Sequence, residues 1–301
     1  MNSVQTTTAS AKKYMLYNPL SGSSDSAHGV GELASNHPNA TAVNMLEISD
    51  YKAFFDGICD GDEIVLCGGD GTLNHFINDT KDIDIKNNVY YYAMGSGNDF
   101  SRDIGHDAYA APDFTINEYI TGLPKVKVDG KEMLFLNGVG FGIDGYCCEV
   151  GDELREANKS LKKPKKINYT AIAIKGLLFK FAPRNATVYV DGERFEYKKV
   201  WIAPTMNGRF YGGGMMPTPG QDRASKDGKL SLMVFHDSGK LRTLMIFPSL
   251  FKGEHIKHTK YVTIHEGDNI KVEFDRPTPI QIDGETIRGV TSYEAAAAVK
   301  Q

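Results

Sequence analysis

One stretch, Glu63 to Asn74, restricts the fold more than any other part of the 301-residue chain. It opens with four apolar residues, 64–67, which are too few for a helix and rich in β-formers, and so predict a buried strand. Three glycines and Asp70 follow at once. Thr72 is then predicted to cap a helix that continues through residues 73–77. The stretch predicts a strand, a glycine turn and a helix.

The glycine turn has the chemistry of an anion site. Gly68, Gly69 and Gly71 let the backbone adopt positive φ and let a ligand approach the main chain closely. The N-terminus of the following helix presents unpaired N–H groups, which suit a phosphate. The carboxylate of Asp70 fits such a site if Mg²⁺ lies between it and the phosphates. An ordinary strand-to-helix turn is the alternative interpretation.

Residues 68–72, Gly-Gly-Asp-Gly-Thr, resemble the nucleotide-binding signature of the diacylglycerol kinase catalytic-domain family. That family includes soluble bacterial lipid kinases and the sphingosine and ceramide kinases. NAD kinases and phosphofructokinases share a related turn, so other segments must distinguish among them.

Two other segments resemble the family's motifs, and the first of them favours the lipid kinase branch. A first predicted strand, 13–17, runs into Asn-Pro-Leu-Ser-Gly at 18–22, which matches the family's Asn-Pro-x-Ser-Gly at every fixed position. A Tyr-rich predicted strand, 88–94, ends in Gly-Ser-Gly-Asn-Asp-Phe-Ser-Arg-Asp at 95–103, which is similar to the family's Gly-Thr-x-Asn-Asp-Phe-Ala-Arg. His75 departs from the pattern, because the family often has an acidic residue there.

The resemblance implies that ATP is the phosphoryl donor and that Mg²⁺ binds with it. Asp70 and Asp99 are expected to contact this ion directly or through water molecules. ATP is expected in a cleft between two domains. The residues implied in nucleotide binding are Asn18, Pro19, Ser21, Gly22, Gly68, Gly69, Asp70, Gly71, Thr72, Leu73, Asn74, Gly95, Ser96, Asn98 and Asp99.

The pattern changes after Gly122. Up to that point strands alternate with helices, which predicts a parallel sheet with helices on both faces. Beyond it, short β-rich segments separated by turns favour an antiparallel sandwich or barrel, and Asp-Gly pairs at 129, 191 and 227 predict hairpin turns. The predicted strands are 124–128, 132–137, 184–190, 195–203, 230–235, 260–265, 269–274 and 279–282.

The predicted fold class is therefore α/β plus all-β. A parallel α/β nucleotide-binding domain is expected at 12–123, and an antiparallel β-rich lipid-acceptor domain at 124–290. A short helix is predicted at 295–299, and the resemblance implies that residues 291–301 return to the first domain.

The second half contains the expected catalytic base. The sequence Asp-Gly-Glu at 283–285 matches a family segment that includes the proposed base, with Glu285 as proton acceptor and Asp283 close enough to share the role. A lipid hydroxyl is a poor nucleophile, and a carboxylate within hydrogen-bond reach can accept its proton during phosphoryl transfer. Taken alone, Asp-Gly-Glu is also a common turn.

Other residues of the second half take roles from the resemblance. Residues 223–230 resemble a structural magnesium loop, with a carboxylate from Asp227 and carbonyls from Ala224 and Lys229. Asp144 matches an aspartate that sphingosine kinases use near the lipid head group, and Arg102 is also assigned to the substrate. The G-x-G-x-x-G pattern at 140–145 does not indicate a dinucleotide site, because no second strand ends in an acidic residue about 20 positions later.

Charge is distributed unevenly along the chain. Residues 1–122 contain 6 Lys and Arg against 17 Asp and Glu, whereas residues 123–301 contain 28 against 21. A basic second half favours an anionic membrane surface or nucleic acid. Lysines at 159–166 lead into helical apolar spacing at 167–178, which fits either a membrane-surface helix or a core helix with a solvated basic end.

The sequence as a whole predicts an ATP-dependent lipid kinase that is cytoplasmic and peripheral to an anionic membrane. No nucleic-acid partner and no transmembrane segment are expected, since no apolar run reaches the length of a span. Four cysteines without a C-x-x-C pattern are predicted to be free thiols. Diacylglycerol is the expected acceptor; a soluble acceptor such as NAD and a non-catalytic lipid- or nucleotide-binding regulator are the alternatives. Homodimerisation stays open.

Overall fold

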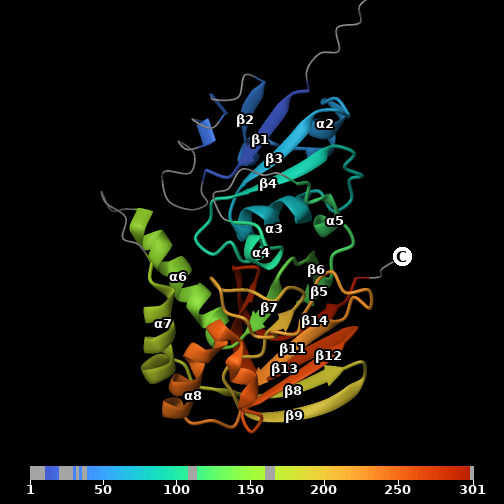
Figure 1. The fold of residues 1–301 in the computed structure, drawn as a ribbon. Coiled ribbons are helices and arrows are strands. Elements are labelled where there is room, and N and C mark those ends of the chain that lie inside the picture. Colours follow the sequence, from blue (N-terminus) through green and yellow to red (C-terminus); the bar gives the residue numbers. More distant parts are fainter. Residues whose placement is uncertain are drawn as a thin grey trace, which may run out of the picture. The chain divides into compact units, whose positions relative to one another are not determined.

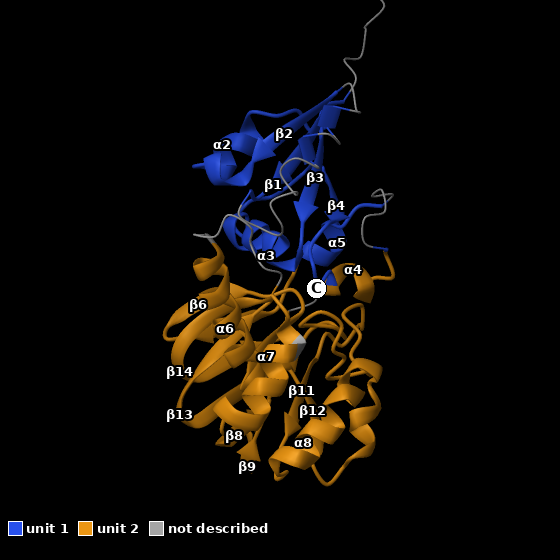
Figure 2. Ribbon diagram, turned by 90° about the vertical axis from the view of Figure 1, so that its left-hand side faces the viewer, with its two compact units in different colours: residues 1–98, 107–121 blue, residues 99–106, 122–301 orange. Residues whose placement is uncertain are grey.

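The structure is a computed structural model that describes residues 11–19, 30–31, 34–35, 39–107, 114–159 and 167–298. The chain separates into two compact units, shown in Figures 1 and 2. The first unit contains residues 1–98 and 107–121, and the second contains residues 99–106 and 122–301.

The first unit is built on a four-stranded parallel sheet in the order β2-β1-β3-β4. This confirms the predicted parallel α/β architecture. The strands are β1 (Lys13–Tyr17), β2 (Ala40–Asn44), β3 (Glu63–Gly68) and β4 (Asn88–Ala93), and the helices are η1 (Met45–Glu47), α2 (Tyr51–Asp56), α3 (Asp70–Asp79) and α5 (Asn117–Ile120).

The core of the first unit follows from the apolar pattern of its central strand and helix. Ile64 and Leu66 of β3 and Phe76 of α3 are fully buried. The ring of Tyr51 meets that of Phe76 edge-on at a centroid distance of 6.0 Å. Helix α2 begins where Asp50 caps it, since the Asp50 side chain accepts a hydrogen bond from the N–H of Ala53 at 3.1 Å. Packing of this kind holds the strand ends in place.

The second unit is built on antiparallel pairing around the long strand β13, which pairs with β7, β8 and β14. The main path of its sheet runs β12-β11-β10-β7-β13-β14-β5-β6, and β8 carries β9 at its side. This confirms the predicted antiparallel C-terminal fold. The strands are β5 (Lys125–Val128), β6 (Lys131–Leu134), β7 (Gly138–Phe141), β8 (Arg184–Val190), β9 (Glu193–Val200), β10 (Thr205–Met206), β11 (Leu230–Phe235), β12 (Val262–Gly267), β13 (Asn269–Ile282) and β14 (Glu285–Ala296).

Helical segments cover part of this sheet, as Figure 1 shows. Among the described residues of this unit, two large buried clusters result. One lies among the strands and includes stacked rings of Phe141 and Phe274, whose centroids are 3.8 Å apart. The other lies beneath the helices and includes Trp201 and Leu177. The helical segments are α4 (Asp99–Asp103), α6 (Ile143–Lys159), α7 (Tyr169–Lys175), η2 (Gly176–Lys180), α8 (Lys240–Ile246), η3 (Phe247–Lys252) and η4 (Glu254–Lys257).

Several predicted elements of the second half differ from the observed ones. Helices α6 and α8 were not expected, and residues 269–274 and 279–282 form one strand with irregular register between them. The expected terminal helix is wrong over its described residues, because Ala295 and Ala296 extend β14 and pair with both β5 and β13. Pairing in the sheet overrides the helix propensity of alanine. Residues 299–301 lie outside the described residues, and the domain limits stay predictions.

Two of the three predicted Asp-Gly hairpin turns are confirmed. Asp129 with Gly130, and Asp191 with Gly192, have positive φ at both positions, as a type I′ turn requires. At 227–228 only Gly228 has positive φ. All four cysteines are free, as predicted. Among the described residues, no helix is both long and apolar enough to cross a membrane.

Candidate active site

The turn between β3 and α3 is shaped by close packing at its glycines. Helix α3 begins at Asp70 with Gly69 as its N-cap, so the predicted cap at Thr72 is wrong. Thr72 lies within the first turn, and a Cβ on Gly68 would come within 2.4 Å of its hydroxyl oxygen. None of Gly68, Gly69 and Gly71 has positive φ. The turn therefore needs glycine for space, and the expected positive φ does not occur.

A second turn, after β4, packs directly on the first. A Cβ on Gly95 would lie 2.4 Å from the Cα of Gly69. Asn98, at φ 51°, accepts a hydrogen bond from the N–H of Gly95 at 2.9 Å and donates one to its carbonyl at 2.8 Å. The Tyr91 hydroxyl donates to the carbonyl of Gly68 at 3.1 Å. These contacts hold two of the three predicted nucleotide turns against each other.

The third predicted nucleotide segment begins at the same edge of the sheet. Tyr17 ends β1 opposite Cys67 of β3, so Asn18 and Pro19 follow at the carboxyl end of the neighbouring strand. In open α/β sheets ligands bind at this edge. Ser21 and Gly22 lie outside the described residues. Asp70 is partly exposed in the first turn of α3, where the helix N-terminus favours negative charge.

Asp99 and Arg102, both on α4, contact each other. Arg102 Nη1 donates to Asp99 Oδ1 at 2.9 Å, and the N–H of Gly213 donates to Asp99 Oδ2 at 2.7 Å. The Asp99 side chain is buried and Arg102 is about half exposed. Asp99 thus joins α4 to the glycine-rich segment at 212–214, a contact that was not anticipated. Its role toward a nucleotide, and that of Arg102 toward a substrate, stay predictions.

The Asp283 carboxylate is enclosed by backbone donors. It accepts from the N–H groups of Leu136 at 2.6 Å, Asn137 at 2.7 Å and Gly138 at 3.0 Å. Asp283 and Gly284 both have positive φ and form the tight turn between β13 and β14. Three donors fix the carboxylate as an acceptor of hydrogen bonds. This arrangement favours a positioning role for Asp283.

Glu285 is the next carboxylate along the hairpin and is exposed. It pairs with Ile282 in the first register position of β14 after the turn. The turn that the Asp283 carboxylate fixes therefore also fixes the backbone of Glu285. Of the two carboxylates predicted as base, Glu285 is the one that solvent and a ligand can reach.

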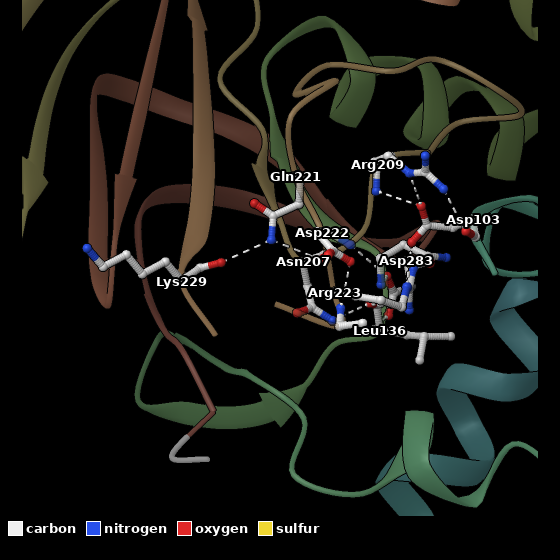
Figure 3. A network of polar contacts seen from close by, with 12 residues as sticks. Asp103, Leu136, Asn207, Arg209, Gln221, Asp222, Arg223, Lys229 and Asp283 are labelled. Atoms are coloured by element: carbon white, nitrogen blue, oxygen red, sulfur yellow. Dashed lines mark hydrogen bonds and ion pairs between the residues drawn. The ribbon is translucent and has the colours of Figure 1, made fainter. Parts of the chain in front are cut away.

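Figure 3 shows the polar network around this hairpin. Arg223 donates to the buried carboxylate of Asp103, to Asn137 Oδ1 at 2.8 Å and to the carbonyl of Leu136 at 3.3 Å. Arg209 also donates to Asp103, at 2.9 Å. The side chains of Asp103 and Arg223 were missed as site residues. Their sequence signal was present, since Asp103 ends the motif at 95–103 and Arg223 begins the predicted magnesium loop.

Asp144 lies at the start of α6 in a buried polar cluster. Within the described part of the chain, neither of its carboxylate oxygens has a hydrogen-bond partner of good geometry, and the same holds for the Tyr211 hydroxyl and Gln281 Nε2. Burial raises the pKa of Asp144 to about 6, and the nearby Gln281 and Tyr211 offset only part of that effect. Burial also raises the pKa of Tyr211. These unsatisfied groups form a set that a polar ligand group would complete.

The glycine pattern at 140–145 is explained by this packing. A Cβ on Gly140 would lie 1.6 Å from Asp144 Oδ2, and one on Gly145 would lie 2.0 Å from the carbonyl of Pro279. Gly142 has φ 125° and lies against the backbone of Trp201. Each glycine makes room for a specific neighbour, and none is needed for a dinucleotide.

The predicted magnesium loop has the contacts of a hydrogen-bonded turn. Asp227 Oδ1 accepts from the Ser225 hydroxyl at 2.6 Å, and the Lys229 carbonyl accepts from Gln221 at 3.0 Å. Across the described residues, no group of three or more His, Cys, Asp or Glu side chains is arranged to hold a metal ion. A metal held by Asp227, Ala224 and Lys229 stays a prediction.

Comparison with known families identifies the chain. Residues 12–126 match the family described as "Diacylglycerol kinase catalytic domain", and residues 138–296 match the "YegS C-terminal NAD kinase beta sandwich-like domain". The chain belongs to the diacylglycerol kinase catalytic-domain family. The resemblance inferred from the turns at 68–72 and 95–103 is thereby confirmed.

Relatives of this family member cover between about three quarters and nearly all of its length. A Staphylococcus epidermidis protein named "Putative lipid kinase SERP0390" is 25% identical over 93% of this chain and 96% of its own. The protein named "Diacylglycerol kinase" of Mycobacterium tuberculosis is also 25% identical, over 73% of this chain and 72% of its own. A solved Bacillus anthracis structure named "putative diacylglycerol kinase" shares the fold, with a TM-score of 0.62 at 19% identity over 97% of this chain and 95% of that one.

Proposed function

We propose that this family member transfers the γ-phosphoryl group of ATP to the hydroxyl of a membrane lipid, with diacylglycerol as acceptor and phosphatidate as product. The observation that carries the proposal is the direct packing of the Gly69 turn on the Gly95 turn, at the edge where open α/β sheets bind ligands. The chain also belongs to a family of lipid kinases.

The first unit is proposed to bind the nucleotide. The N–H groups at the start of α3 are suited to the phosphates, and Gly69 and Asp70, where this helix begins, are partly exposed. Asp70, partly exposed in the same turn, is a fitting oxygen ligand for Mg²⁺ that arrives with ATP. When bound, this ion would neutralise charge on the transferring phosphate.

The second unit is proposed to hold the acceptor. Glu285 accepts the proton of the lipid hydroxyl as the phosphoryl group transfers, and Asp283 positions it through the hairpin. Asp144 and its unsatisfied neighbours Tyr211 and Gln281 orient a hydroxyl of the acceptor. With a lipid as acceptor, the protein is proposed to act peripherally at a membrane surface, and we propose the cytoplasm as its location.

The test is transfer of labelled phosphate from ATP, with Mg²⁺, to a panel of lipids in anionic mixed micelles. The panel contains diacylglycerol, a sphingoid base, phosphatidylglycerol, an isoprenoid alcohol and, as a soluble acceptor, NAD. We expect label on diacylglycerol. Label on NAD alone, or ATP binding without transfer to any acceptor, would overturn the proposal.

Two variants test the residue roles in the same assay. Asp70→Ala and Glu285→Ala are expected to lose turnover by about 100-fold or more while the circular dichroism spectrum stays that of the wild type. Wild-type rates in both variants would contradict the assigned roles.

A further inference from the structure

Two continuous helical segments of the second unit, α7 with η2 and α8 with η3, carry large apolar side chains on their outer faces. Phe179 of η2 and Leu241 and Met245 of α8 are 75%, 74% and 72% exposed. Ile174 of α7 and Phe251 of η3 are also exposed. The segments touch, since α8 contacts η2 and Lys240 Nζ donates to the carbonyl of Leu178 at 3.0 Å. We call the outer face of α7, η2, α8 and η3 the α7–α8 surface (Figure 1).

The exposed side chains are not needed to hold these segments in place. The inner faces are already packed in the cluster beneath the helices, where Leu177, Ile246 and Leu250 are buried. Asn168 caps α7 by accepting a hydrogen bond from the N–H of Ala171 at 2.9 Å. Each segment thus has a core side that fixes it and a second apolar side that faces solvent. Exposed apolar groups gathered in this way mark interaction sites.

The charge on the α7–α8 surface indicates the partner. Neither 169–182 nor 239–253 contains an Asp or Glu. The same two segments contain five basic residues, all exposed: Lys175, Lys180, Lys240, Arg242 and Lys252. Exposed aromatic and aliphatic tips among lysines, with no acidic residue, complement an anionic lipid surface, where long basic side chains reach the phosphates and apolar tips enter the head-group region.

We propose that the α7–α8 surface docks this protein onto anionic bilayers through Phe179, Leu241 and Met245, with the surrounding lysines contacting lipid phosphates. The inference rests on the proposed function, because an enzyme whose acceptor is a lipid must reach the bilayer that contains it. The surface is distinct from Glu285 and the Asp144 cluster, so docking and phosphoryl transfer can be tested separately.

The experiment measures co-sedimentation of the full chain with vesicles of phosphatidylcholine containing phosphatidylglycerol, and with vesicles of phosphatidylcholine alone. We expect binding to the anionic vesicles that weakens with added salt. A triple variant, Phe179→Ser with Leu241→Ser and Met245→Ser, and a double variant, Lys175→Gln with Lys180→Gln, are each expected to reduce binding about tenfold or more. The matched control is Leu46→Ser, which removes an exposed leucine of the first unit and should bind as the wild type does.

The outcomes separate docking from catalysis through a second assay, transfer to a short-chain diacylglycerol dissolved without vesicles. Vesicle binding lost in the triple variant with soluble transfer retained supports the proposal. Wild-type binding in both variants, or no vesicle binding by the wild type, overturns it even where soluble transfer occurs. If the wild type binds vesicles but transfers phosphate to no lipid, the proposed docking surface is supported and the proposed function is contradicted. Sedimentation velocity without lipid tests whether the surface instead binds a second copy of the chain. A dimer in the wild type that is absent in the triple variant would show that it does, and would overturn the proposal of membrane docking.

Discussion

Asp103 and Arg223 form an ion pair in which both side chains are almost completely buried, 3% and 7% exposed. Arg223 continues from this pair to Asn137 and to the carbonyl of Leu136. The N–H groups of those same two residues donate to Asp283. A chain of direct contacts therefore runs from α4 to the hairpin that carries Glu285.

Loss of Arg223 should destabilise the protein strongly. Among the described residues, Arg223→Ala would leave Arg209 as the charged partner of the buried Asp103 carboxylate, and we expect the free energy of unfolding to fall by about 3–5 kcal/mol. Arg209→Ala is the matched control, because the Arg209 side chain is 43% exposed and its loss leaves the Asp103 carboxylate paired with the buried Arg223, so we expect a smaller decrease in the free energy of unfolding. Urea denaturation followed by circular dichroism measures both. Equal losses in the two variants would show that burial does not distinguish the pairs.

Asp283 and Glu285 should separate stability from catalysis. Asp283→Ala removes the acceptor of three backbone N–H groups, and we expect it to cost about 3 kcal/mol or more in urea denaturation. Glu285→Gln changes an exposed side chain, so stability should change by less than about 0.5 kcal/mol. Its phosphoryl transfer should fall by about 100-fold or more. Near-normal transfer in Glu285→Gln would exclude this residue as the base.

Gly95 should tolerate no side chain. Gly95→Ala would place a Cβ 2.4 Å from the Cα of Gly69, and since the obstacle is backbone, the two turns must move apart. We expect a loss of about 1–3 kcal/mol in stability and weaker ATP binding in titration calorimetry. Gly61→Ala is the control, because its Cβ would meet nothing within 4 Å. If Gly95→Ala binds ATP as tightly as the wild type does, the turn at Gly95 is not part of the nucleotide site.

The first unit could be predicted closely because its signals are local. The strand at 63–68 and the glycine turn after it follow from short-range pattern and turn chemistry. The start of α3 was misplaced because Gly69, in an extended conformation, already serves as the N-cap. A side-chain cap is only one way to begin a helix.

The second unit was predicted less well because its decisive contacts are distant in sequence. The sequence predicts that Ala295 lies in a helix, but in the structure this residue pairs with Ile270 and Val126 in the sheet. Arg223 and Asp103 are 120 positions apart, and Asp283 meets Leu136 across 147. A short stretch of sequence does not show such pairs. Arg223 was therefore predicted to lie in a loop rather than in a buried ion pair. For the same reason, the sequence could not distinguish a positioning role of Asp283 from the role of a base.

Asp144 should make stability depend on pH. Its pKa is raised by burial from 3.8 to about 6, so the folded state holds the proton more tightly than the unfolded chain. The stabilisation this gives is complete below about pH 4 and is lost as the pH rises through about 6, which amounts to about 3 kcal/mol. Asp144→Asn has no proton to lose. Its free energy of unfolding relative to the wild type should therefore rise by up to about 3 kcal/mol between pH 4 and pH 8.

Urea denaturation at pH 4, 5, 6, 7 and 8 measures that difference, with Asp268→Asn as the control, since Asp268 is exposed on the same unit. A difference between Asp144→Asn and the wild type that stays constant over this range would mean that the buried carboxyl does not titrate there. The same variant links stability to function. If Asp144 orients the acceptor, transfer to lipid should fall in Asp144→Asn at pH 8, although this variant gains stability relative to the wild type between pH 4 and pH 8.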